Sequence, residues 1–190
     1  MKHKLNSLLG LFLATSFSAN AALITIESVD IATNFNESDL QAYWNSTSPA
    51  SSQIVTDLSG LYFNGSAHNN TLFKLTADFS STNPLEVSFF AGLDAGRGAE
   101  IFVNNVLTVN DDSNIWWSRN WNSSDVIGVE NILFGAGSNS IELYWGENRN
   151  SGGNSFLLEE TELATVEASS PAIVALFGLG LAGLAFRRKK

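Results

Sequence analysis

The chain of 190 residues has no cysteine and only two histidines, His3 and His68. It can therefore form no disulfide, no thiolate nucleophile and no zinc site of the usual nitrogen and sulfur ligands. A Ser-His-Asp triad would have to use His68, and no Gly-x-Ser-x-Gly elbow accompanies it. We expect a protein that is not an enzyme and needs no cofactor. Paired carboxylates of a polysaccharide hydrolase stay open as an alternative, because the chain has many acids.

Positive charge is scarce between the two ends of the chain. All nineteen acidic residues lie between Glu27 and Glu167, and only four basic residues fall among them, Lys74, Arg97, Arg119 and Arg149. Nineteen acidic and four basic residues give this region a net charge of −15. Such a surface repels polyanions, so nucleic acid is excluded as a partner.

The N-terminus has the pattern of a secretory signal peptide. Lys2 and Lys4 precede an apolar stretch over residues 8–17, and the small residues Ala19 and Ala21 flank Asn20. This order predicts a signal peptide over residues 1–21, removed by signal peptidase. An uncleaved membrane anchor is the alternative, and a core of ten residues is short for it.

The C-terminus combines an apolar segment with a cluster of positive charge. Residues 172–186 are rich in Leu, Ala and Gly, and four cations follow, Arg187, Arg188, Lys189 and Lys190. A helix over residues 171–186 would span about 24 Å, short for a hydrocarbon core of about 30 Å. Cations at one end hold such a segment on the cytoplasmic side of a membrane. The pattern predicts a hydrophobic helix that enters a membrane.

This tail resembles the PEP-CTERM sorting signal of Gram-negative bacteria, which a membrane enzyme called exosortase reads. Glu167 and Pro171 stand where that signal has its motif, without a contiguous Pro-Glu-Pro, and Arg187 and Arg188 begin its basic end. The resemblance implies a linker with the sorting motif over residues 164–171 and a sorting helix with a basic tail over residues 172–190. It implies export, transient insertion in the inner membrane, and delivery to the outer surface or the extracellular space. A permanent tail anchor is the alternative.

The region between the signals, residues 22–163, is long enough for one domain. Apolar and polar residues alternate in most of its segments, which predicts β-strands with one buried face. Strands are expected over residues 23–27, 71–79, 85–89, 99–103, 106–109, 139–145 and 155–158. Residues 37–44 fit a short helix or a strand. We predict an all-β fold, a two-sheet jelly-roll-like β-sandwich, because turn-rich spacers separate the strands at short intervals.

Two segments of this domain are more distinctive than its composition. Residues 94–102 read Asp-Ala-Gly-Arg-Gly-Ala-Glu-Ile-Phe, and residues 116–121 read Trp-Trp-Ser-Arg-Asn-Trp. Over roughly residues 85–158 the chain resembles the CCXG family of exported PEP-CTERM proteins. It departs from that family at residues 147–153, Glu-Asn-Arg-Asn-Ser-Gly-Gly, where the family has Cys-Cys-x-Gly. A more distant resemblance is to protective-antigen-type sandwiches, some of which bind glycans through Asp-coordinated calcium.

The aromatic segment offers a candidate ligand-binding site, made of Trp116, Trp117, Trp121, Arg119 and Asn120. Flat aromatic rings suit the apolar faces of sugar rings, and the polar side chains suit hydroxyl groups. The other interpretation is that one or two of the three tryptophans fill the core at the end of a sheet. Trp44 and Trp145 lie in regular apolar patterns and are expected in the core.

Loop carboxylates could hold calcium, a cation that prefers oxygen ligands. Asp94, Asp111 and Asp112 are the candidate ligands, although no ligand loop of known spacing occurs. Solvated acidic loops are the alternative.

Three functions remain open. The first is an adhesive or structural protein of the cell surface or biofilm matrix, in contact with extracellular polysaccharide. The second is a dedicated glycan-binding module that uses Trp116, Trp117 and Trp121. The third is a polysaccharide hydrolase.

Overall fold

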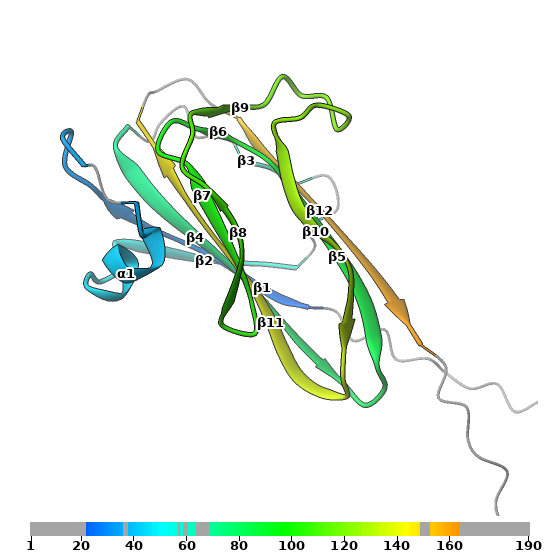
Figure 1. Ribbon diagram of the computed structural model, residues 1–190. Helices are drawn as coiled ribbons and strands as arrows, with labels where there is room; N and C mark the ends of the chain where they lie inside the picture. Colours follow the sequence, from blue (N-terminus) through cyan, green and yellow to red (C-terminus); the bar gives the residue numbers. More distant parts are fainter. Residues whose placement is uncertain are drawn as a thin grey trace, which may run out of the picture.

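The computed structural model describes residues 22–35, 38–56, 58, 61–63, 69–148 and 153–163. Two antiparallel sheets face each other, and one short helix lies outside them (Figure 1). The predicted all-β sandwich is confirmed. The predicted signal peptide, linker and sorting helix lie outside the described residues. Within the described ranges, no helix is both long enough and apolar enough to span a membrane.

The strands form one large and one small sheet, with a short pair at one end. The large sheet has the order β2 (Ser51–Val55), β1 (Leu23–Asp30), β4 (Thr71–Ser81), β11 (Gly137–Glu147), β7 (Ala99–Val103), β8 (Val106–Asp111). The small sheet has the order β10 (Val126–Phe134), β5 (Leu85–Gly92), β12 (Asn154–Glu162), β3 (Leu61–Phe63). The short pair is β6 (Asp94–Ala95) with β9 (Ile115–Trp116).

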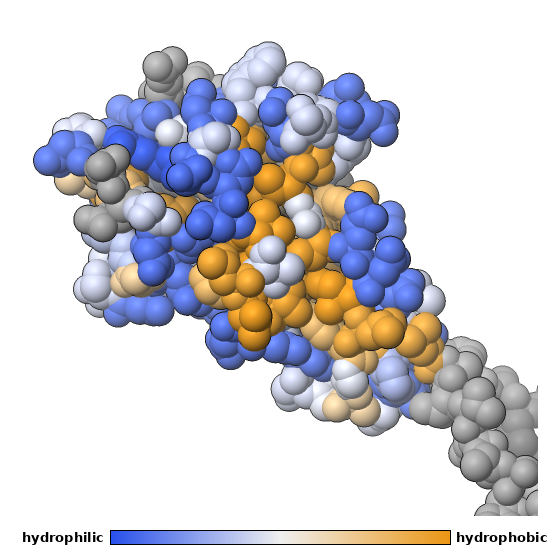
Figure 2. All heavy atoms as spheres, viewed as in Figure 1, coloured by the Kyte–Doolittle hydropathy of each residue, from blue (hydrophilic) through white to orange (hydrophobic). Residues whose placement is uncertain are grey.

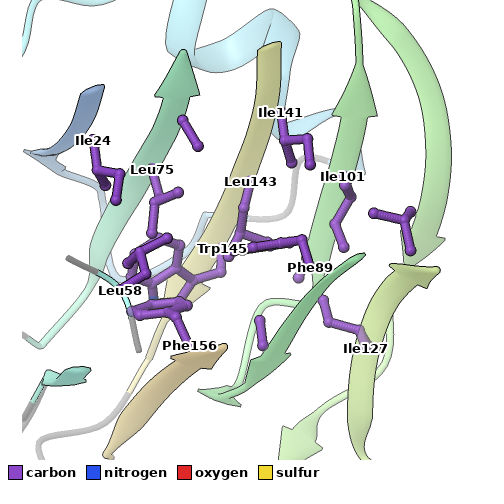
Figure 3. Close-up of a cluster of buried hydrophobic side chains, with 14 of the residues drawn as sticks. Ile24, Leu58, Leu75, Phe89, Ile101, Ile127, Ile141, Leu143, Trp145 and Phe156 are labelled. Carbon is purple, nitrogen blue, oxygen red and sulfur yellow. The ribbon is translucent and has the colours of Figure 1, made fainter. Parts of the chain in front are cut away.

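The core lies between the two sheets. Successive residues of a strand point to opposite faces, so the alternating apolar residues of β11, Ile141, Leu143 and Trp145, all point inward and are fully buried (Figure 3). The Trp145 ring stacks on Phe73 of β4 at 4.9 Å and lies 5.5 Å from Phe156 of β12. Trp145 therefore packs against both sheets, and its predicted place in the core is confirmed.

Helix α1 (Leu40–Asn45) covers the outer face of the large sheet. The sequence allowed either a short helix or a strand over residues 37–44, and the structure has a helix there. The Asp39 side chain caps it, and Glu100 of β7 accepts hydrogen bonds from its first two backbone N–H groups at 3.1 and 3.0 Å. Trp44 of the helix is buried against Tyr144 of β11, as predicted for a core tryptophan. The buried carboxylate of Glu100 thus ties the helix to the sheet.

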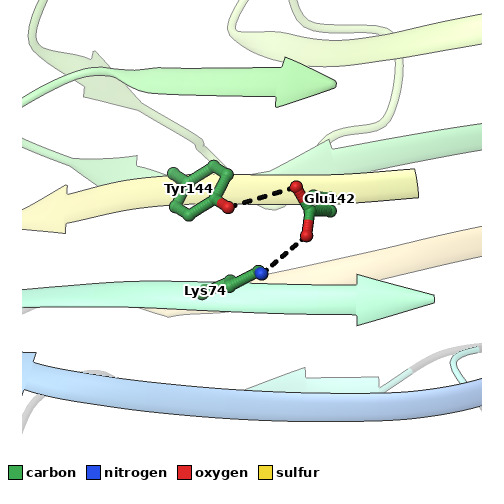
Figure 4. Close-up of polar contacts among 3 residues, drawn as sticks. All are labelled: Lys74, Glu142 and Tyr144. Atoms are coloured by element: carbon green, nitrogen blue, oxygen red, sulfur yellow. Dashed lines mark hydrogen bonds and ion pairs between the residues drawn. The ribbon is translucent and has the colours of Figure 1, made fainter. Parts of the chain in front are cut away.

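Three polar side chains, Lys74, Glu142 and Tyr144, interact on this sheet (Figure 4). Lys74 of β4 forms an ion pair of 2.6 Å with Glu142 of β11, which also accepts a hydrogen bond from the Tyr144 hydroxyl at 3.1 Å. Burial alone would lower the pKa of Lys74, but its contacts with Glu142 and Tyr144 outweigh that effect and raise it. The charged form of Lys74 is therefore favoured in the folded protein.

The predicted hairpin between β7 and β8 is present. Its two turn residues, Asn104 and Asn105, have φ angles of 49° and 63°, the left-handed region that asparagine tolerates.

An apolar band runs between the edge strands β8 and β10 (Figure 2). Val106 and Leu107 of β8 and Leu133 of β10 are its most exposed members.

Candidate functional site

Two long connections meet at one end of the sandwich. Residues 93–98 join β5 of the small sheet to β7 of the large one, and residues 112–125 join β8 back to β10. Gly92, the last residue of β5, pairs with Val126, the first residue of β10, so both connections leave the sandwich at the same end. The short strands β6 and β9 pair within them and tie them together (Figure 1). Residues 93–98 and 112–125 are called the loop end below.

Trp117 is the buried anchor of the loop end. It is 7% exposed, its backbone N–H donates to the Leu93 carbonyl at 2.9 Å, and its indole Nε1–H donates to the Asn120 carbonyl at 3.1 Å. Its ring lies directly on Gly92, where an added Cβ would come within 2.4 Å of the ring carbons. The missing side chain of Gly92 therefore makes the space that Trp117 occupies.

The other two tryptophans of the loop end face solvent. Trp116 is 62% exposed and Trp121 is 39% exposed, and the Trp121 ring lies 5.0 Å from the buried Trp117 ring at 51°. Arg119, with a φ of 62°, makes the turn between them. We call Trp116 and Trp121 the tryptophan platform. Of the two interpretations of this segment, core filling applies to Trp117, and an exposed surface applies to the platform.

The two other predicted ligand-binding residues have different surroundings. The Asn120 side chain accepts a hydrogen bond from the Asn122 backbone N–H at 3.0 Å, and its carbonyl holds Trp117. Asn120 therefore stabilises the turn of the loop end. Arg119 is exposed beside it.

A buried polar network lies beneath the loop end. The Asn154 side chain accepts a hydrogen bond from the Asp94 backbone N–H at 3.0 Å and donates one to Glu147 Oε1 at 2.9 Å. Asn154 and Glu147 are almost entirely buried, with Glu147 1% exposed. Burial raises the pKa of Glu147 to about 7, against the Asn154 hydrogen bond, and the nearby charge of Asp94 adds to the rise. This network joins β6, β11 and β12.

The three predicted calcium ligands do not gather at one place. Asp94 lies beside the buried network, whereas Asp111 and Asp112 line a pocket next to helix α1. One Asp111 oxygen already accepts a hydrogen bond from the Ser113 backbone N–H at 2.9 Å. No three His, Cys, Asp or Glu side chains in the described part of the chain are close enough together to hold a metal ion. Calcium binding stays a prediction.

Two residues of this region, Asn154 and Arg97, were not predicted as site residues from the sequence. Asn154 follows a glycine-rich stretch and resembles an ordinary loop residue in sequence, and its hydrogen bond to Glu147 joins strands of two different sheets. Arg97 lies in a glycine-rich turn, and its role at the pocket depends on the segment at residues 33–35, which is distant in sequence. Residues 94–102 were distinctive in sequence, but nothing in that motif indicates the contacts that Arg97 makes.

Residues 167–189 match the family model of the PEP-CTERM protein-sorting motif. The chain carries this sorting motif. The predicted PEP-CTERM signal is therefore confirmed, and the matched range contains Glu167, Pro171, Arg187 and Arg188, whose individual roles stay predictions. The motif indicates an exported protein that is processed by an exosortase-type sorting enzyme.

No curated protein matches the chain. Among solved structures, it is similar to a PA14 sugar-binding domain from an RTX adhesin, with 15% identity, a TM-score of 0.47 and coverage of 76% of this chain and 91% of that one. The PA14 domain of the MpAFP antifreeze protein has 14% identity, a TM-score of 0.43 and coverage of 77% and 83%. A β-glucosidase from Kluyveromyces marxianus has 9% identity and a TM-score of 0.44, and the match covers 74% of this chain but only 16% of the β-glucosidase.

Proposed function

We propose that the protein is an exported β-sandwich that attaches to polysaccharide at the cell surface or in the extracellular matrix. The observation that carries this proposal is the tryptophan platform: the exposed Trp121 ring packs on the buried Trp117 ring, and Trp116 at the end of β9 is 62% exposed. The role is adhesive or structural, and the attachment uses Trp116 and Trp121 directly.

The platform has the physical properties of a sugar-binding surface. Exposed tryptophan rings offer large flat apolar areas, which match the apolar faces of pyranose rings. Trp116 is held in β9, and Trp121 packs on the anchored Trp117, so both rings lose little freedom when a ligand covers them. Polar side chains around the platform, Arg119 among them, supply donors and acceptors for hydroxyl groups.

Charge limits the class of polysaccharide. The region from Glu27 to Glu167 carries a net charge of −15, and a strongly acidic surface repels an acidic polymer. The proposal therefore concerns polysaccharides without acidic groups.

A catalytic role is disfavoured by the burial of the most suitable carboxyl group. Glu147, with a pKa of about 7 and a second carboxylate at Asp94 nearby, has the electrostatics of a general acid. Its side chain is 1% exposed and hydrogen-bonded to the buried Asn154, so a glycosidic oxygen has no access to it. We propose that Glu147 is structural.

The test is binding of the purified full-length protein to insoluble neutral polysaccharides, such as cellulose and a β-1,3-glucan, measured by co-sedimentation. Trp116→Ala and Trp121→Ala should each weaken binding about tenfold, because each removes a stacking surface. Trp116→Phe keeps a flat ring and should lose less than Trp116→Ala. Trp116→Ala should unfold at the wild-type temperature, because its ring is mostly exposed. Trp121→Ala removes a ring that packs on Trp117, so it should unfold at a somewhat lower temperature while remaining folded at the temperature of the assay.

Ile54→Ala is the matched control, because Ile54 is an equally exposed apolar residue on the edge strand β2. It should bind as the wild type does. Unchanged binding of Trp116→Ala and Trp121→Ala, or equal losses for Ile54→Ala, would contradict the proposal.

A further inference from the structure

A pocket of about 350 Å³ opens beside the loop end, between the segment that precedes helix α1 and the end of β8. This volume lies at the lower end of the range for small-molecule sites, about 300–1,000 Å³. Most of the pocket lining is polar, with Phe35 and Leu40 as its large apolar members. The other lining residues are Ser38, Gly96, Arg97, Ala99, Asn110, Asp111 and Asp112.

Arg97 is the fixed cation of this pocket. Its guanidinium donates hydrogen bonds to the carbonyls of Phe35 and Thr33, the latter at 2.8 Å, and it lies 5.9 Å from the Phe35 ring centre. Its backbone N–H donates to the Gly146 carbonyl at 2.9 Å. Within the described residues, the third guanidinium nitrogen, Nε, is buried and has no hydrogen-bond partner. A ligand cannot reach this buried nitrogen, but each terminal guanidinium nitrogen carries two N–H groups, so Arg97 has donors beyond its bonds to Phe35 and Thr33.

Acceptors complete the pocket. Asp111 and Asp112 provide carboxylate oxygens, and Ser38 provides a hydroxyl group, which can donate or accept. Phe35 and Leu40 also line the pocket but are 6% and 1% exposed, so they offer a ligand little apolar surface. A ligand that fits must therefore carry several hydroxyl donors and at least one acceptor oxygen.

We propose that this pocket binds one uncharged sugar residue. The inference rests on the proposed function and names a second contact for the same glycan. A uronic acid would pair with Arg97 but meet two carboxylates and the acidic surface. The ammonium group of an amino sugar would be attracted to the two carboxylates but would meet the like charge of Arg97. An uncharged sugar avoids both repulsions and uses donors and acceptors together.

The position of the pocket allows one oligosaccharide to contact it and the platform. Asp112 at the pocket and Trp116 of the platform are four residues apart in the same connection. Four residues span at most about 14 Å between Cα atoms, even when fully extended. A short oligosaccharide can cover that distance, so the sugar in the pocket and the sugars on the platform can belong to one chain.

The test measures binding of methyl glycosides of glucose, galactose and mannose to the full-length protein by isothermal titration, with glucuronate and glucosamine as charged counterparts. Ser38→Phe fills the pocket and should abolish binding of the neutral glycoside. Asp112→Asn removes one charged acceptor at constant size and should weaken binding about tenfold. Matched controls are Ser52→Phe on strand β2 and Asp78→Asn on strand β4, both at exposed positions, and both should bind as the wild type does.

Trp116→Ala separates the pocket from the platform. It should leave the affinity for the free methyl glycoside unchanged while weakening the binding of polysaccharide. The pocket proposal is overturned if no neutral glycoside binds, if a charged sugar binds more tightly, or if Ser38→Phe binds as the wild type does. In each of these cases the platform is judged separately, by polysaccharide binding of Trp116→Ala.

Discussion

Replacing Glu147 with glutamine should change how the stability of the protein depends on pH. Glu147 is buried under the loop end, and its pKa is raised from 4.5 to about 7. A raised pKa means that the folded protein favours the protonated carboxyl more than the unfolded chain does. Stability is therefore lost as the pH rises from about 4.5 to about 7, and the whole penalty is present above pH 7.

The size of this penalty follows from the two pKa values. A rise from 4.5 to about 7 corresponds to about 3 kcal/mol in the free energy of unfolding. Glutamine cannot ionise, so Glu147→Gln avoids that loss. Its oxygen can still accept the hydrogen bond from Asn154, and any misfit of its amide nitrogen is the same at every pH. The free energy of unfolding of the variant, relative to the wild type, should rise by about 3 kcal/mol between pH 4 and pH 8.

The assay is urea unfolding of both proteins at pH 4, 5, 6, 7 and 8, followed by tryptophan fluorescence. Subtracting the free energy of unfolding of the wild type from that of the variant cancels the titration of all other groups. The pH profile of one protein alone would include them. The difference should rise most steeply between pH 4.5 and 7. A difference that is constant over the whole range would refute the reasoning, because Glu147 would then ionise equally well in both states.

Three further predictions concern the packing around the site. Trp117→Ala should lower the free energy of unfolding by about 3–5 kcal/mol, as a buried aromatic does, and a loss below 1 kcal/mol in urea unfolding would contradict its role as anchor. Gly92→Ala should cost about 1–3 kcal/mol in the same assay, because its methyl group meets the Trp117 ring; wild-type stability would show that this contact is wrong. Glu100→Ala should speed hydrogen exchange at the backbone amides of Leu40 and Gln41, which lose their acceptor, whereas equal exchange rates would place helix α1 elsewhere.

The fold could be predicted from the sequence wherever one face of a strand is buried. In β4 the inward residues Phe73, Leu75, Ala77 and Phe79 alternate with polar ones, and in β11 Ile141, Leu143 and Trp145 are likewise every second residue. A shift by one residue would turn these apolar side chains away from the core. Strand β10 was not predicted, because its alternation is interrupted. A register shift between Val129 and Ile132 forms a bulge, where Asn131 has a φ of 52°. An interrupted pattern looks like a loop in sequence.

The sequence predicted an aromatic candidate site, but not which of its tryptophans are exposed. Three tryptophans within six residues indicate either a surface or a core, and the sequence cannot choose between them. Gly92, more than twenty residues earlier, decides the question by leaving space for Trp117 alone. The pocket depends likewise on Arg97 reaching the carbonyls at residues 33 and 35. Such long-range contacts carry no local signal.

The most direct measurement of glycan attachment follows the indole N–H signals of the five tryptophans by NMR while a soluble neutral oligosaccharide is added to ¹⁵N-labelled protein. Substitution of each tryptophan assigns its signal. The signals of Trp116 and Trp121 should shift with the ligand in a saturable manner, while those of the buried Trp44 and Trp145 stay in place. Saturable shifts of Trp44 or Trp145 alone, or no shift of any indole signal with any neutral oligosaccharide, would contradict attachment through the tryptophan platform.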